Sequence, residues 1–105
     1  MTAAWADNQK PWKLASERQW GLTVILLNRT FMFPWSHFLY AEGGDDEIRL
    51  AFSTHDVVVT GSRLIELMAD LSAQRVSMLR EPVRAEMFGY DRAPHISGIS
   101  VRKVE

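Results

Sequence analysis

Cysteine is absent from the 105-residue chain, and this absence removes several classes of function at once. Without a thiol the chain can form no disulfide, hold no cysteine-based zinc site and use no thiolate nucleophile. Chains without disulfides suit reducing compartments, and the first residues lack the basic segment and apolar run of a secretory signal. We therefore expect a soluble, cytoplasmic protein.

Long apolar runs and a dominant charge are absent as well. The longest apolar stretch, around Gly21–Leu27, is far shorter than the roughly 20 residues that span a bilayer, so no membrane partner is expected. The 12 basic and 13 acidic residues give a net charge of −1. No global field would draw such a chain to nucleic acid, although a local basic patch is still compatible with this balance.

The composition that is present indicates one small folded domain, with 47% hydrophobic and 24% charged residues. The first 18 residues are polar and are interrupted by Pro11. We predict that residues 1–18 form an N-terminal arm, which is either mobile or packed through Trp5 and Trp12. Residues 19–105 are predicted to form a single domain.

Alternation of apolar and polar residues predicts strands over much of this domain. Ile48, Leu50 and Phe52 alternate with residues that are charged or small, which is typical of a strand with one buried face. Gly43 and Gly44, followed by two aspartates, predict the hairpin turn before that strand. Further strand patterns lie at residues 21–28, 30–42, 56–60, 75–81 and 95–105.

One helix is predicted near residues 62–74, with Ser62 as its N-cap. Its apolar residues follow the i, i+3, i+4, i+7 spacing of a single buried stripe. Strands around one helix indicate an α+β fold with a mostly antiparallel, strongly bent sheet of about five or six strands. Such a sheet could form a small open barrel. The buried stripe of the predicted helix consists of Leu64, Leu67, Met68 and Leu71.

Aromatic residues are concentrated on both faces of the strand pattern at residues 30–42. Two apolar faces indicate either burial on both sides or contact with another subunit. Pro34 lacks an N–H donor and favours an edge strand, a bulge or a break. We predict either a subunit interface, most simply with a second copy of the chain, or a small-molecule pocket, formed by Phe31, Phe33, Trp35, Phe38 and Tyr40.

Basic residues in the C-terminal half predict a second kind of surface. If the last strand pairs near Arg75–Arg80, several of them share one face and could contact RNA or DNA. A bent sheet of this size is compatible with small barrels such as the Sm-like fold, by fold analogy only. The candidate nucleic-acid contacts are Arg75, Arg80, Arg84, Arg92, Arg102 and Lys103.

Patterns for catalysis and metal binding are missing from the sequence. His37, His55 and His95 have no metal-ligand spacing, and no nucleophile elbow or phosphate-binding loop occurs. We therefore predict no catalytic residue, no metal and no cofactor. The leading hypothesis is a non-enzymatic, homo-oligomeric domain that acts by binding. The alternatives are an oligomeric RNA- or DNA-binding barrel and a small metal- or ligand-dependent enzyme that uses one of the histidines.

Overall fold

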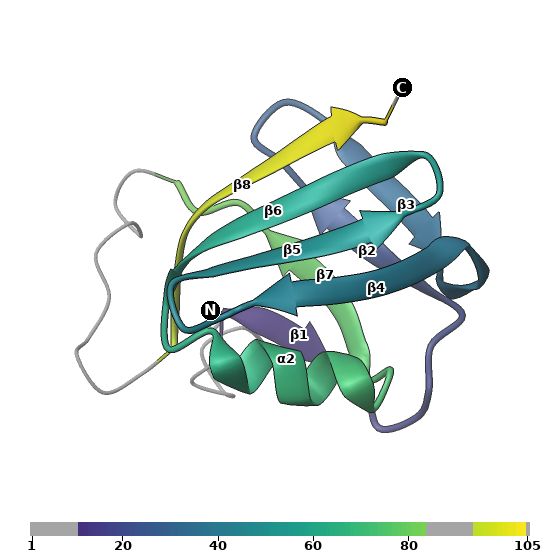
Figure 1. The fold of residues 1–105 in the computed structure, drawn as a ribbon, viewed down its shortest axis with the longest axis horizontal. Helices are drawn as coiled ribbons and strands as arrows, with labels where there is room; N and C mark the ends of the chain where they lie inside the picture. Colours follow the sequence, from purple (N-terminus) through teal and green to yellow (C-terminus); the bar gives the residue numbers. More distant parts are fainter. Residues whose placement is uncertain (1–10, 84–93, 105) are drawn as a thin grey trace, which may run out of the picture.

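Two four-stranded sheets face each other in the computed structural model, which describes residues 11–83 and 94–104 (Figure 1). Sheet A has the order β1-β7-β2-β3 and sheet B the order β4-β5-β6-β8. Sheet A contains β1 (Trp12–Leu14), β7 (Val76–Arg80), β2 (Gly21–Ile25) and β3 (Thr30–Pro34). Sheet B contains β4 (Phe38–Gly43), β5 (Glu47–Phe52), β6 (His55–Ser62) and β8 (His95–Lys103).

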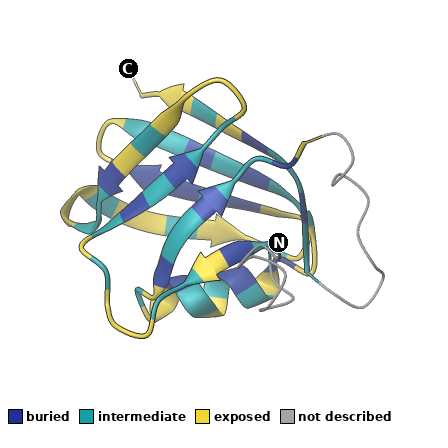
Figure 2. Cartoon of the chain, turned by 180° about the vertical axis from the view of Figure 1, so that it is seen from behind, coloured by how far each residue is buried: buried dark blue, intermediate teal, exposed yellow. Residues whose placement is uncertain are grey.

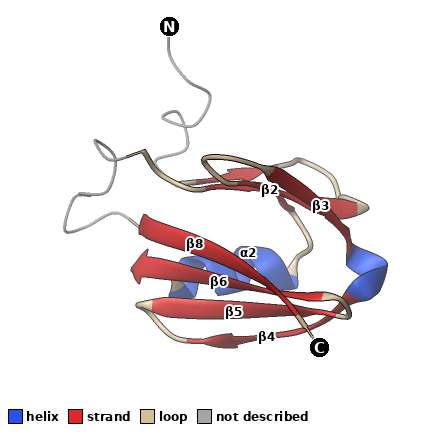
Figure 3. Cartoon of the chain, turned by 90° about the horizontal axis from the view of Figure 1, so that it is seen from above, coloured by secondary structure: helices blue, strands red, loops and turns tan. Residues whose placement is uncertain are grey.

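The layered arrangement is clearest from above, where the two sheets lie one over the other (Figure 3). The short 3-10 helix η1 (Trp35–His37) carries the chain from sheet A into sheet B, and α2 (Ile65–Ser72) carries it back. All strand pairs are antiparallel except β2 with β7. The predicted α+β class with mostly antiparallel strands is confirmed. Eight strands are formed rather than five or six, and neither sheet closes into a barrel within the described residues.

Strand β1 lies inside the segment that we predicted as an N-terminal arm. It pairs with β7, and the indole of Trp12 is completely buried in the core. The Trp12 Nε1 donates a hydrogen bond of 2.8 Å to Asp70 Oδ2 on α2. Residues 12–14 are therefore packed against the rest of the domain, and Trp12 is the residue that anchors them. Trp5 lies outside the described residues.

The predicted hairpin between β4 and β5 is confirmed. Gly43 has a φ of +143°, which is accessible to glycine and rarely to other residues, and the Gly44 N–H donates to the Glu47 carbonyl at 2.8 Å. On β5 the side chains of Ile48, Leu50 and Phe52 are buried, as the alternation predicts. Pro34 ends β3, which is an edge strand of sheet A, in agreement with its missing N–H donor.

The helix begins at Ile65, and its cap differs from the one we predicted. Ser62 is the last residue of β6, and the N-cap position is Leu64, which has no capping side chain. Asp45 at the β4–β5 turn takes over this role. Its carbonyl accepts from the Leu64 N–H at 2.8 Å, and its Oδ1 accepts from the Ile65 N–H at 3.3 Å. A residue twenty positions away in sequence therefore caps α2.

Replacement of Asp45 by alanine is expected to lower the free energy of unfolding by about 0.5–1 kcal/mol, because Ile65 loses its side-chain acceptor and the helix N-terminus loses a nearby negative charge. Asp45→Asn keeps an acceptor and should recover part of that loss. Urea denaturation of both variants measures the difference. Equal stability of Asp45→Ala and the unsubstituted chain would contradict the capping role.

The core lies between the sheets and is closed on one side by α2, which runs beside β1 and β4 (Figure 1). All sixteen residues of the main cluster are apolar, and among the described residues no polar or charged side chain is buried. The core therefore contains no described group that is suited to chemistry. The cluster contains Trp12, Leu22, Val24, Phe33, Ile48, Leu50, Phe52, Val57, Val59, Leu64, Leu67, Leu71, Val76, Leu79, Ile96 and Ile99.

Candidate interaction surfaces

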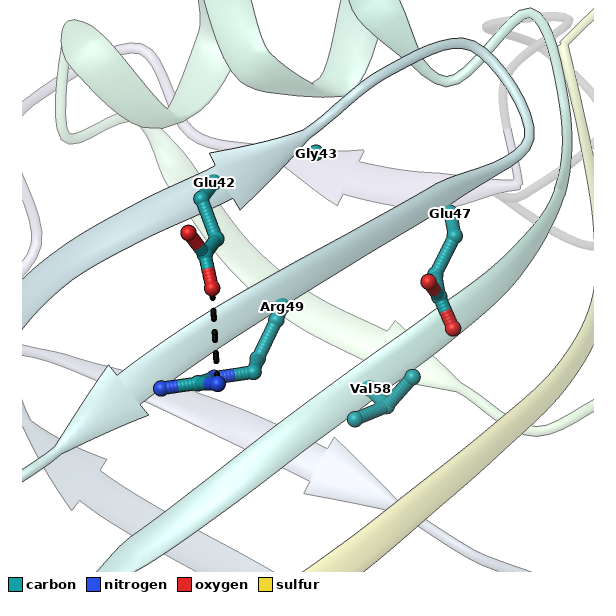
Figure 4. Close-up of a pocket in the computed structure, with 5 residues that line it drawn as sticks. All are labelled: Glu42, Gly43, Glu47, Arg49 and Val58. Carbon is teal, nitrogen blue, oxygen red and sulfur yellow. Dashed lines mark ion pairs between the residues drawn. The ribbon is translucent and has the colours of Figure 1, made fainter.

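Charged residues occupy the outer face of sheet B, around a shallow hollow of about 310 Å3 (Figure 4). The hollow is lined by Glu42 and Gly43 from β4, Glu47 and Arg49 from β5, and Val58 from β6. In the close-up the Glu42 carboxylate points to the Arg49 guanidinium. The hollow therefore brings charged side chains from two neighbouring strands together.

Arg49 at the centre of this hollow already has partners within the protein. Its Nη2 donates to the Tyr40 hydroxyl at 2.7 Å, and its guanidinium lies 5.6 Å from the centre of that ring. Its Nη1 lies 3.4 Å from Glu42 Oε2, and its Nε lies 3.9 Å from Asp56 Oδ2. Exposed pairs of this kind contribute little to stability. They do balance the Arg49 charge, so this face is a solvated sheet surface with paired charges.

The outer face of sheet A has a different composition, with no acidic residue on its strands. Strand register places Met78, Thr23 and Met32 side by side across β7, β2 and β3. Ile25 and Pro34 lie on the same face, and Met32 is 57% exposed. Figure 2 views the molecule from this side. We call this surface the sheet A patch, defined by Thr23, Ile25, Met32, Pro34 and Met78.

Further exposed apolar side chains lie at the two ends of β2. Trp20, just before the strand, is 67% exposed, and Leu27, in the hairpin to β3, is 65% exposed. Single exposed apolar residues are common on protein surfaces, whereas a contiguous group often marks an interaction site. The sheet A patch and these ends are therefore the strongest candidate interface among the described residues.

None of the five residues that we predicted as an interface or pocket belongs to the sheet A patch. Met32 lies on the second apolar face of the 30–42 pattern, and that second face is what predicted a contact beyond the core. Thr23, Ile25 and Met78 were missed, because they join Met32 only through the pairing of β2 with β3 and β7.

The aromatic residues that we predicted as an interface or pocket are divided by the fold. Phe33 is buried, with its ring 4.6 Å from that of Phe52 across the two sheets. Phe31 stacks on Phe33 at 5.5 Å, and Trp35 makes an edge contact with Phe38 at 5.2 Å. These four side chains form the corner between the sheets. Tyr40 lies apart from them, on the outer face of sheet B with Arg49.

A small apolar hollow does occur beside Phe38, between β4 and α2. Its volume is about 190 Å3, and neither Trp35 nor Tyr40 lines it. Pockets for small molecules usually measure roughly 300–1,000 Å3, so this hollow is too small to define a ligand class. It is lined by Phe38, Ala41, Met68, Leu71 and Ser72.

The four described residues of the predicted nucleic-acid surface are divided between the two sheets. That prediction required the last strand to pair near Arg75–Arg80, but β8 pairs with β6. Arg75 and Arg80 therefore belong to sheet A, whereas Arg102 and Lys103 are on the edge strand of sheet B. The premise was wrong because strand order is not encoded in local alternation. Arg84 and Arg92 lie outside the described residues.

Two of the three histidines are far apart in the fold. His55 and His95 lie at opposite ends of the β6–β8 pair. The His55 ring lies 5.5 Å from Phe31 and 5.4 Å from Phe33, so it extends the aromatic corner. Among residues 11–83 and 94–104, no three His, Asp or Glu side chains are grouped so that they could hold a metal ion.

No helix in the described part of the chain has the length and apolar character needed to cross a bilayer. Comparison with models of protein families, with curated proteins and with solved structures finds no match for the chain. The case for function therefore depends on the surfaces described above.

Proposed function

We propose that the chain is a non-enzymatic binding module, acting in the cytoplasm, that docks through the sheet A patch. The observation that carries the proposal is the contrast between the two outer faces. Sheet B presents paired charges around Arg49, as a solvated antiparallel sheet does. The outer face of sheet A carries Met32, Met78 and Ile25 instead. An apolar sheet face is normally covered by a second layer of structure.

Self-association is the simplest form of such docking, with the patches of two copies packed face to face. Four strands about 4.8 Å apart and about five residues long present roughly 300 Å2 of face. Stable complexes bury about 800 Å2 per partner. The proposed dimer is therefore weak. Lys13, on the same face as the patch, brings like charges together in that dimer.

Met32→Gln is expected to weaken this self-association severalfold, because it places a polar amide of similar length at the most exposed position of the patch. Sedimentation velocity over a concentration series measures the dimer fraction. Higher salt should increase that fraction in the unsubstituted chain, because it screens the basic residues. Leu39→Gln is the matched control, since Leu39 is 63% exposed on sheet B. A dimer that is equally sensitive to both substitutions would count against the sheet A patch.

A further inference from the structure

We infer that the partner of the sheet A patch is an acidic, amphipathic helix of another protein. This inference rests on the proposed function and adds the chemistry of the partner. It follows from the distribution of charge between the two sheets, which the net charge of −1 conceals.

The surroundings of the sheet A patch are basic. Lys13 is adjacent to Met78 on the outer face, and Arg80 is adjacent to Ile25. The acidic residues nearby are few. Glu17 is exposed in the β1–β2 connection, and Glu81 Oε1 accepts a hydrogen bond of 2.9 Å from the Leu27 N–H. Three further basic residues belong to the loops of sheet A, where all are exposed: Arg18, Arg29 and Arg75.

The sheet B half carries the compensating negative charge. Its acidic residues outnumber its basic ones and lie mainly on β4, β5 and the turn between them. Among the described residues the charge is therefore polarised, with a positive sheet A and a negative sheet B. Complementary charge selects partners and raises association rates. The acidic residues on sheet B and its β4–β5 turn are Glu42, Asp45, Asp46, Glu47 and Asp56, against the basic residues Arg49, Arg102 and Lys103.

A second copy does not satisfy this charge pattern on the sheet A patch. Two sheet A faces bring Lys13 of each copy, and the exposed arginines in the loops of that sheet, onto a surface of the same sign, which is repulsive. The negative outer face of sheet B carries the Arg49 pairs, so covering the patch with it would desolvate charges against apolar groups. An acidic partner with an apolar face avoids both costs.

The apolar centre of the patch favours a helix over a nucleic-acid strand. Single-stranded nucleic acids are held largely by the stacking of successive bases on aromatic rings. Trp20 is the one exposed ring beside the patch among the described residues, and the rings of Phe31 and Phe33 are directed into the aromatic corner. Met32 and Met78 offer flexible, polarisable side chains that adapt to a packed helix. The apolar stripe of an amphipathic helix is narrow, about 100° of its circumference. The sheet A patch is also narrow, because it covers only three neighbouring strands.

Four probes test the inference on the complete chain. The first is an amphipathic peptide of roughly 18 residues, about five helical turns, with leucine on one face and glutamate on the other. The second replaces every glutamate with lysine. The third is oligothymidylate, and the fourth is a vesicle of phosphatidylcholine and phosphatidylserine. Labelled peptide and oligonucleotide are followed by fluorescence anisotropy, and vesicles by co-sedimentation, at low and raised salt.

The glutamate peptide is expected to bind at least about tenfold more tightly than the lysine peptide and to weaken as salt rises. Lys13→Gln should weaken it about two- to fivefold, because one exposed charge is removed. Lys103→Gln removes the same charge from the edge of sheet B and should leave binding unchanged. Met32→Gln should weaken the glutamate peptide while the fold is retained, as monitored by circular dichroism.

Two kinds of failure can be told apart. If Met32→Gln changes neither peptide binding nor self-association, the sheet A patch is not a docking surface and the proposed function fails with the inference. If Met32→Gln weakens self-association but both peptides bind equally, or the lysine peptide binds better, the patch docks a copy and the acidic-helix inference is overturned. Tighter binding of oligothymidylate or vesicles than of the glutamate peptide overturns it in favour of a nucleic acid or an anionic lipid surface.

Discussion

Trp12→Ala is expected to lower the free energy of unfolding by about 3–5 kcal/mol, the range for removal of a fully buried large aromatic side chain. Trp12 has no exposed surface and lies in the main core cluster, on a strand of only three residues. Its indole also donates to Asp70 on α2 at 2.8 Å. The substitution therefore removes core volume and the contact by which β1 is attached to the helix.

A loss of this size is a large part of the stability of a small domain, so Trp12→Ala could unfold the chain outright. Trp12→Phe provides the graded measurement. It keeps most of the ring but removes the Nε1 donor, and it should cost less than Trp12→Ala. Urea denaturation gives both values from the midpoint and slope. A loss below about 1 kcal/mol for Trp12→Ala would mean that β1 is not part of the stable core, and that residues 1–18 behave as the arm that the sequence predicts.

Local periodicity explains which parts of the fold could be predicted. The alternation around Leu50 and the stripe through Leu67 each record a buried face within one element, and both elements are formed. The turn after Gly43 is equally local, because its φ of +143° selects glycine. Predictions of this kind need no knowledge of what lies opposite the element.

The features that were missed depend on pairing between distant residues. Strand β1 is too short to show an alternation, and its burial is decided by β7 and α2. The partner of β8 is β6 rather than β7, which no property of residues 95–105 specifies. The same holds for the sheet A patch, whose residues come from three strands. Met32 lies on the second apolar face of the 30–42 pattern. Which residues of other strands lie beside Met32 depends on the strand order of sheet A.

The β6–β8 pair also shows how one irregularity changes a predicted face. The sequence alternation places Ile96 and Ile99 on opposite faces of the last strand, but both are buried. Thr60 pairs with Gly98, and the next residue, Gly61, pairs with Ile96. Ser97 is therefore an extra residue in β8 that is skipped in the register with β6. Such a bulge reverses the alternation after it.

Gly61→Ala is expected to destabilise the protein by about 3 kcal/mol or more, at the upper end of the range for overpacking. A Cβ at Gly61 would overlap the carbonyl oxygen of His95 and lie 2.8 Å from its carbonyl carbon and 3.0 Å from Ile96 Cα. All three atoms are backbone, so no side-chain rotation relieves the contact. Strand β8 must move away from β6 at the bulge, and Ile96 then leaves the core.

Gly98→Ala on the facing strand is the matched control. The nearest atom to its added Cβ is Thr60 Oγ1 at 3.3 Å, the end of a side chain that can rotate. Its cost should stay below about 1 kcal/mol. Chemical denaturation gives the two stabilities, and amide hydrogen exchange along residues 55–62 shows whether the loss is concentrated at the Gly61 end of the pair. Equal effects of the two substitutions would mean that β8 does not approach Gly61 through its backbone, and the register that buries both Ile96 and Ile99 would then be wrong.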